Sequence, residues 1–294
     1  MPNHFNDIEV DISKKHEEIN DIIPKHPFGQ LSLKTRIIHH FLRKIKLYPK
    51  LVDSGFIRRW FDEFNFYWQK ELKGRPLKLH DFFYLHSYYR VKFQDISLES
   101  ENNSDKFLQD WQKPANIYQT FSCAYQYASN PFSYIPFKKY LKRNSSILEY
   151  GCGFAPITTS LAHYKPNKYN LSIADIPQYT YHYAKWKLSK FKVKTIDIDP
   201  SKLPQLEKYD VIFIITVLEH LTNPLEVIKH LSDHLNPNGF LIFDYIKGEG
   251  LGLDTKKSLE QRAEVIHYLK NNLKLIDGVL NEKYSMKTTV VQKK

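Results

Sequence analysis

The sequence predicts an α/β protein with a doubly wound, mostly parallel seven-stranded sheet that has one antiparallel strand. An all-helical region is predicted before it in the chain, at the N-terminus. Strand-like apolar runs alternate with amphipathic helical segments after residue 146, while helical spacing of aromatic residues fills the chain before about residue 130. With 294 residues, 42% of them hydrophobic, the chain has enough apolar material for a packed core, which excludes whole-chain disorder. We therefore predict two parts, residues 1–130 and residues 131–294.

The N-terminal region is predicted to be helical from the spacing of its apolar and aromatic side chains. These recur at intervals of three and four residues, and Gly74-Arg75-Pro76 interrupts the pattern. The region is a candidate substrate lid or subunit interface, and a homodimer would fit the second role. The expected elements are helical stripes over 33–45 and 56–68, an aromatic segment over 82–93, a polar loop over 97–106, and helices over 116–128 and 136–141.

The second part is predicted to form a parallel sheet covered by helices on both faces. Its strands are continuous apolar runs, which is typical of strands buried on both sides. The last two strands are joined by only five residues, too few for a crossover, so this pair must be antiparallel. Strands are expected at 147–150, 169–174, 193–196, 211–216, 240–245, 273–280 and 286–292, and helices at 156–164, 179–189, 224–235 and 258–270.

Charge and composition limit the classes of function. The chain carries 43 Lys and Arg against 32 Asp and Glu, a net charge of +11, but no dense basic cluster, so nucleic-acid binding is disfavoured. Its two cysteines, Cys123 and Cys152, cannot form a disulfide framework or a thiolate metal site. We expect a cytoplasmic protein without a membrane span, because no signal-peptide pattern and no apolar run of about 20 residues occurs.

A glycine-rich turn comes after the first predicted strand, in the segment Ile147–Pro156. Gly151 and Gly153 allow a sharp turn and a close approach of the main chain to a ligand, and Pro156 suits the start of a helix. A dinucleotide fingerprint would have Gly or Ala where Pro156 stands. The carboxylate of Glu149 would repel a pyrophosphate but suits a cationic ligand with hydroxyl groups, which argues against NAD.

Acidic residues end the next strands, and the carboxyl ends of parallel strands meet at one edge of the sheet. Asp175 ends the second strand and is placed to accept both hydroxyls of a ribose. Asp197, with Asp199 as the alternative, ends the third and could accept an adenine amino group. Thr216 ends the fourth strand, just before Glu219-His220.

The segment from about 146 to 245 resembles the class I S-adenosylmethionine (SAM)-dependent methyltransferases, particularly their small-molecule branch, which has a Val-Leu-Glu-His segment after strand four. The resemblance implies a SAM cofactor, a ribose contact from Asp175, an adenine-side contact from Asp197 and no metal. The residues expected to bind the cofactor are Glu149, Tyr150, Gly151, Cys152, Gly153, Ala155, Asp175, Ile176, Asp197, Ile198 and Thr216.

The acceptor is predicted from the residues that come after the fourth strand. Amino-methylating enzymes of nucleic acids resemble one another in an Asn/Asp-Pro-Pro-aromatic turn, and arginine methyltransferases in two close glutamates; neither pattern is present. This favours a small or medium polar metabolite, such as a sugar hydroxyl. An RNA or protein methyltransferase and a non-catalytic SAM-binding protein are the alternatives. His220 and Glu219 are the catalytic candidates, although His220 could equally be a structural residue.

Overall fold

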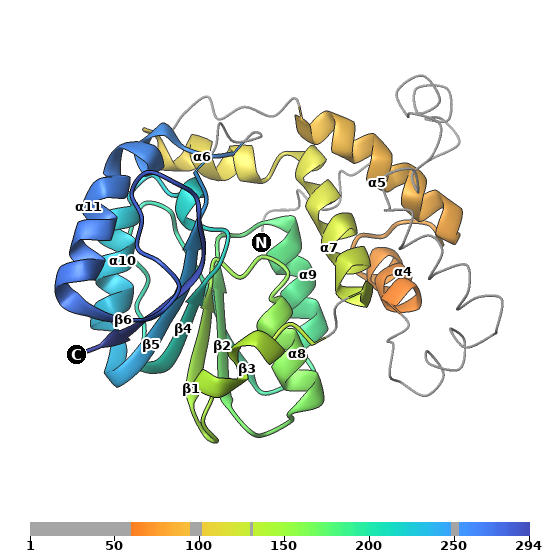
Figure 1. The fold of residues 1–294 in the computed structure, drawn as a ribbon. Helices are drawn as coiled ribbons and strands as arrows, with labels where there is room; N and C mark the ends of the chain where they lie inside the picture. Colours follow the sequence, from red (N-terminus) through yellow and green to blue (C-terminus); the bar gives the residue numbers. More distant parts are fainter. Residues whose placement is uncertain (1–59, 95–101, 130–131, 248–252) are drawn as a thin grey trace, which may run out of the picture. The chain divides into compact units, whose positions relative to one another are not determined.

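The computed structural model describes residues 60–94, 102–129, 132–247 and 253–294, which form parts of two compact units (Figure 1). One unit contains residues up to Gln94 and Pro114–Pro131, and the other contains Asp95–Lys113 and Phe132–Lys294. The described residues 102–113 therefore belong to the unit that contains the sheet, although the predicted division between the two parts lies near residue 130. The helical stripe expected over residues 33–45 lies outside the described residues.

The described elements of the first unit are helical and pack through aromatic rings. They are α4 (Trp60–Lys70), α5 (Leu79–Gln94), η3 (Pro114–Asn116) and α7 (Ile117–Ser129). The ring of Phe121 on α7 lies 5.4 Å from Trp68 on α4 and 5.0 Å from Phe82 on α5, measured between ring centroids. These three side chains are buried, so the aromatic stripe predicted for this unit forms its core.

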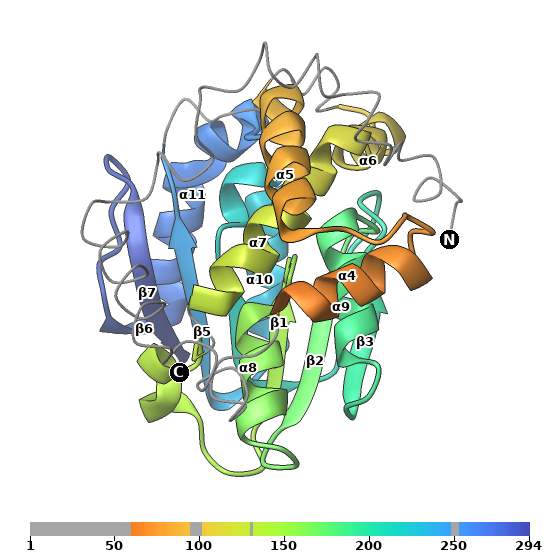
Figure 2. The same cartoon turned by 90° about the vertical axis from the view of Figure 1, so that its right-hand side faces the viewer.

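The second unit is built on a seven-stranded sheet with the order β3-β2-β1-β4-β5-β7-β6 (Figure 2). β1 to β5 are parallel, and β7 is antiparallel to both β5 and β6. This confirms the predicted fold class and the antiparallel terminal pair. The strands are β1 (Ser146–Tyr150), β2 (Asn170–Asp175), β3 (Val193–Asp197), β4 (Tyr209–Ile214), β5 (Leu235–Tyr245), β6 (Leu273–Asp277) and β7 (Met286–Lys293).

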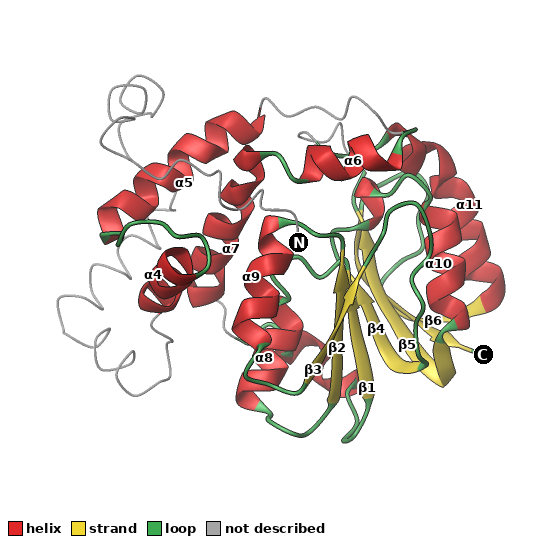
Figure 3. Ribbon diagram, turned by 180° about the vertical axis from the view of Figure 1, so that it is seen from behind, coloured by secondary structure: helices red, strands yellow, loops and turns green. Residues whose placement is uncertain are grey.

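Helices cover both faces of the sheet (Figure 3). β1 shows why, because Ile147 packs into the apolar layer under α8 (Pro156–Tyr164) and α9 (Tyr179–Leu188). Leu148 points to the opposite layer, under α10 (Pro224–Asp233) and α11 (Lys256–Asn272). Successive side chains of a strand point to opposite faces, so a strand that is apolar throughout must be covered on both.

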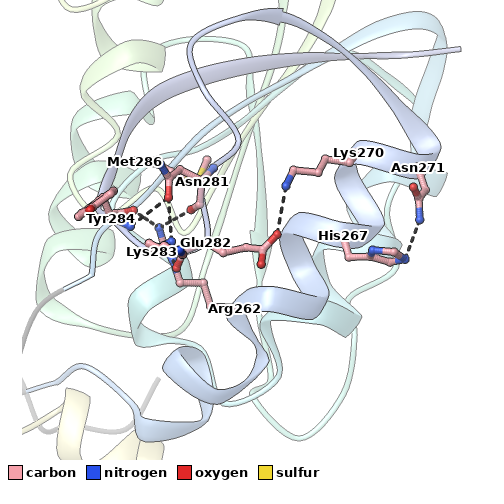
Figure 4. Close-up of polar contacts among 9 residues, drawn as sticks. All are labelled: Arg262, His267, Lys270, Asn271, Asn281, Glu282, Lys283, Tyr284 and Met286. Atoms are coloured by element: carbon pink, nitrogen blue, oxygen red, sulfur yellow. Dashed lines mark hydrogen bonds and ion pairs between the residues drawn. The ribbon is translucent and has the colours of Figure 1, made fainter.

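Arg262 joins α11 to the connection between β6 and β7 (Figure 4). Its guanidinium is buried and donates hydrogen bonds to four main-chain carbonyls, those of Tyr245, Asn281, Glu282 and Tyr284, at 2.7–3.2 Å. The planar fork of an arginine is suited to holding several fixed acceptors at once. These hydrogen bonds hold the β6–β7 connection, and with it the antiparallel strand β7, against α11.

Several element ends differ from the sequence prediction. β4 ends at Ile214, so Thr216 lies two residues beyond the strand, and β6 ends at Asp277 rather than at residue 280. Residues 104–106, expected in a loop, begin the helix α6 (Ser104–Trp111), whose N-cap Asn103 accepts hydrogen bonds from two main-chain amides through its side chain. The helix expected to continue to residue 235 ends at Asp233, and Asn236-Pro237-Asn238-Gly239 belongs to β5 instead. None of the described helices is long and apolar enough to cross a membrane.

Candidate active site

The turn after β1 has an unusual main-chain conformation. Gly151, Gly153 and Ala155 have φ angles of +61°, +49° and +50°, in the left-handed region that glycine adopts most readily. A Cβ on Gly151 would lie 2.4 Å from a methyl carbon of Val217, so only glycine fits between the turn and the segment after β4. The main-chain N–H of Cys152 donates to the carbonyl of Ala174 at 3.1 Å and ties the turn to β2.

Glu149 is engaged with the start of α8. Its carboxylate oxygens accept hydrogen bonds from the main-chain N–H groups of Thr158 at 2.8 Å and Ile157 at 3.3 Å. Ala155, at the N-cap, cannot supply this cap from its own side chain, so the buried carboxylate satisfies amides that the helix leaves open. Burial raises the pKa of Glu149 to about 7, although these hydrogen bonds oppose the shift. A direct cofactor contact from Glu149 stays a prediction.

Asp175 closes the same turn from the end of β2. Its buried carboxylate accepts hydrogen bonds from the N–H of Gly153 at 2.6 Å, the N–H of Ile176 at 2.7 Å and the side-chain amide of Gln178 at 3.1 Å. Burial raises its pKa to about 6 against the effect of these donors. A carboxylate has about four acceptor positions, so room for one further donor remains.

The end of β3 lies beside Asp175, because the strand register pairs Asp175 with Asp197. The Asp197 side chain is 56% exposed and forms an ion pair with Lys185 at 2.8 Å. Ile198 is buried, and its N–H donates to the Asp175 carbonyl at 2.8 Å. The alternative acid, Asp199, instead accepts from the N–H and hydroxyl of Ser201.

The segment after β4 carries the second strained position. Thr216 has φ +56°, which is rare for a β-branched residue, and such strain concentrates at functional sites. Its N–H donates to the Asp244 carboxylate, at the end of β5, at 2.6 Å. The short helix η5 (Leu218–His220) then presents Glu219 and His220.

His220 is held by two acceptors on one ring nitrogen. Its Nδ1 lies 3.0 Å from a carboxylate oxygen of Asp254 and 3.1 Å from the carbonyl of Leu253. Two acceptors at Nδ1 place a hydrogen there, which leaves Nε2 as the proton acceptor of the neutral ring. Burial would lower the pKa of His220, but the Asp254 bond and the charge of Glu219 outweigh it and raise the pKa above the usual 6.5. Sequence reasoning missed Asp254.

Glu219 is buried, and neither of its carboxylate oxygens accepts a hydrogen bond from another of the described residues. Burial raises its pKa to about 7. A buried carboxylate without a partner is costly, and such groups are frequent at functional sites.

The helix α6 crosses this edge of the sheet. The side-chain amide of Gln112, directly after the helix, donates to the carbonyl of Pro177 beyond β2 at 2.7 Å. The buried ring of Trp111 meets the His220 ring edge-on, with centroids 5.2 Å apart. The C-terminal end of α6 thus contacts both the segment after β2 and the segment after β4.

Residues 95–279 match the family described as "Methyltransferase domain" (Methyltransf_23). The chain belongs to this methyltransferase family. The assignment confirms the resemblance to SAM-dependent methyltransferases, with SAM as the cofactor of the domain. The matched segment includes α6 and every strand from β1 to β6.

The methyltransferase is similar to several known proteins. It is 28% identical over 144 residues to malonyl-[acyl-carrier protein] O-methyltransferase 2 of Ilyobacter polytropus, a match covering 48% of this chain and 55% of that relative. The chain thus spans about half the length of this relative. Among solved structures, the N-methyltransferase NodS of Bradyrhizobium japonicum with S-adenosyl-L-homocysteine (SAH) gives a TM-score of 0.43 at 18% identity, covering 58% of this chain and 91% of NodS. A SAM-dependent methyltransferase of Clostridium acetobutylicum gives 0.43 at 18% identity, covering 60% and 99%.

The residues of this edge fit SAM, which carries a sulfonium, an ammonium and a ribose. The strand order reverses between β1 and β4, and ligands of such sheets bind at the carboxyl edge beside this switch point. The glycine turn, Asp175 and Thr216 all lie there. The hydroxyl of Thr180 is buried without a partner among the described residues, and it lies 3.5 Å from the position of a Cβ on Gly153.

Two further observations concern other ligand sites. Among the described residues, no group of three His, Cys, Asp or Glu side chains could hold a metal ion. A hollow of about 500 Å³ opens beside α10 and α11, and Lys229, His267 and Tyr268 belong to its lining. None of the predicted site residues lines it.

Proposed function

We propose that this chain transfers a methyl group from SAM to a small or medium polar metabolite. The observation that carries the proposal is that the glycine turn, Asp175 and the His220–Asp254 pair share the carboxyl edge beside the switch between β1 and β4. When bound, SAM supplies an electrophilic methyl group and a neutral thioether as the leaving group. The protein has mainly to align the acceptor with that methyl group and to exclude water.

The cofactor half of the site is assigned to β1 and β2. Gly151 and Gly153 let the main chain approach the ligand, and Asp175 is proposed to accept a ribose hydroxyl at its remaining acceptor position. Asp197 is the proposed adenine-side acid and would have to leave Lys185 or share its charge. Tyr150, Cys152, Ala155, Ile176 and Ile198 are proposed to shape the walls around these groups.

The acceptor half is assigned to the ends of β4 and β5. His220 is the proposed general base, because its Nε2 is the ring nitrogen left to accept a proton from the acceptor. Asp254 is a positioning residue that holds the ring in this tautomer and stabilises the imidazolium that forms. Trp111 covers one side of the ring and limits its access to water.

The candidate acceptors come from the sequence and from the name of one relative. A sugar hydroxyl stays one candidate, and the name of the Ilyobacter polytropus relative suggests the malonyl group of an acyl-carrier protein as another. An RNA or protein acceptor is the alternative; salt-sensitive RNA binding would favour it. The N-terminal region, residues 1–130, is proposed as a lid or as a homodimer interface.

Calorimetric titration with SAM and SAH, with NADH as the control, tests the proposal. We expect micromolar binding of the first two and none of NADH. Asp175→Asn should weaken SAH binding at least tenfold, whereas Glu207→Gln, an exposed carboxylate paired with Lys194 and outside the proposed contacts, serves as the control. Absence of SAM and SAH binding by the wild-type chain would refute the proposal, and equal affinities of the two variants would refute the assignment of Asp175.

A further inference from the structure

Acidic side chains gather on the acceptor half of the edge. Glu219 on η5, Asp244 at the end of β5 and Asp254 before α11 are close enough to interact electrostatically with one another or with His220. Among the described residues, the one ion-pair partner of these three carboxylates is His220, which bonds Asp254. This local charge opposes that of the whole chain, which is +11.

Glu219 shows that the acidic group is more than a solvated surface. Only 4% of this residue is exposed, and neither carboxylate oxygen accepts a hydrogen bond from another described residue. The side chain is therefore cut off from water and lacks a partner inside the described part of the protein. Removing a carboxylate from water without compensation is expensive, so a partner supplied by a ligand would recover that cost.

The nearby guanidinium of Arg262 does not provide this partner. It is close enough to Glu219 to feel its charge, but its hydrogen bonds go to four main-chain carbonyls around β5 and the β6–β7 connection. Those carbonyls fix the guanidinium in place. Glu219 thus keeps its acceptor positions for another donor.

An aromatic ring completes the surroundings. Trp111 packs edge-on against His220, and its indole N–H is buried without a partner among the described residues. Indole rings and carboxylates together are the side chains that attract organic ammonium groups.

We infer that the methyl acceptor is an amine, recognised as its ammonium form by Glu219, Asp244 and Asp254 beside Trp111. This inference rests on the proposed function and names its substrate class. One N–H proton of the ammonium passes to Nε2 of His220, which frees the nitrogen lone pair. That lone pair forms the new N–C bond while the C–S bond of the sulfonium breaks, and the bonding pair leaves with sulfur.

The same arrangement selects against anionic acceptors. A carboxylate, such as the free acid group of a malonyl thioester, would enter beside three like charges and would be repelled. A neutral hydroxyl could donate one hydrogen bond to Glu219 but would bring no positive charge to balance the carboxylate.

Three probes that share a phenyl ring and a two-carbon spacer test this selectivity: 2-phenylethylamine, 2-phenylethanol and 3-phenylpropanoate. Their affinities are measured by calorimetry at pH 8 on the full chain saturated with SAH. The amine should bind at least tenfold more tightly than either of the others. Glu219→Gln should weaken amine binding at least fivefold, whereas Glu207→Gln, an exposed carboxylate paired with Lys194, is the matched control and should leave it unchanged.

The outcomes separate this inference from the proposed function. If SAH binds but the carboxylate or the alcohol binds as tightly as the amine, or if none of the three binds, the amine assignment is wrong while the methyltransferase proposal stands. If Glu219→Gln lowers the melting temperature and leaves amine affinity unchanged, Glu219 is a structural counter-ion of Arg262 and the inference is overturned. Retained melting temperature with weakened amine binding supports it.

Discussion

The substitution Gly151→Ala tests whether the turn after β1 is fixed by space as well as by backbone conformation. The new methyl group would lie 2.4 and 2.7 Å from the two methyl carbons of Val217, and the residue would have to keep φ near +61°. The left-handed conformation costs an L-residue about 1–2 kcal/mol, and overpacking a core costs about 1–3 kcal/mol. The free energy of unfolding should therefore fall by roughly 2–5 kcal/mol.

Gly153→Ala is the matched control, because φ is +49° there but the nearest contact of the new Cβ would be the Thr180 hydroxyl at 3.5 Å. It should cost only the conformational part, about 1–2 kcal/mol. Urea denaturation measures the free energy of unfolding of both variants. The double variant Gly151→Ala with Val217→Ala should lose about 1 kcal/mol less of this free energy, or better, than the sum of the two single changes. Equal losses for the two glycines, or strictly additive behaviour of the pair, would contradict the steric explanation.

Three further predictions concern the edge of the sheet and α11. His220→Ala should lower turnover at least a hundredfold while SAH affinity changes less than twofold; a loss of SAH binding would place this ring in the cofactor half. Burial raises the pKa of Glu219 to about 7, so the folded state favours the protonated carboxyl, and its contribution to the free energy of unfolding falls as pH rises from about 4.5 to 7. Glu219→Gln should therefore flatten this part of the profile of unfolding free energy against pH. A steeper profile in the variant would disprove the assignment. Arg262→Met should reduce the free energy of unfolding, measured by urea denaturation, by about 2–5 kcal/mol, because four main-chain carbonyls lose their buried donor. A change below about 0.5 kcal/mol would show that these carbonyls accept hydrogen bonds from other donors.

The sheet could be predicted because its signals are local. Each parallel strand is a short apolar run, and the five residues between the last two strands allow only an antiparallel pair. The helix over 104–111 was missed because its first residues are polar and its buried apolar side chains are only Phe107 and Trp111. Its stability depends on packing against the sheet, which no local pattern reports.

The candidate site was predictable in position but not in its partners. The strand order brings the end of β2 and the segment after β4 to one edge, so Asp175 and His220 lie close enough to interact electrostatically. Which atoms a carboxylate bonds depends on segments far apart in sequence. Glu149 caps α8 rather than standing free, and Asp254 reaches His220 from a segment beyond the end of β5.

The place of β7 inside the sheet has a consequence for synthesis. β7 pairs with β5 on one side and β6 on the other, and Lys293 near its end donates to the carbonyls of Ser232 and Leu235, where α10 gives way to β5. Until residues 286–293 have left the ribosome, β7 is absent, so the main-chain groups of β5 and β6 that pair with it have no partner strand. An exposed strand edge recruits other chains, so ribosome stalling or proteolysis just before Met286 would yield a product prone to aggregate rather than a shortened enzyme.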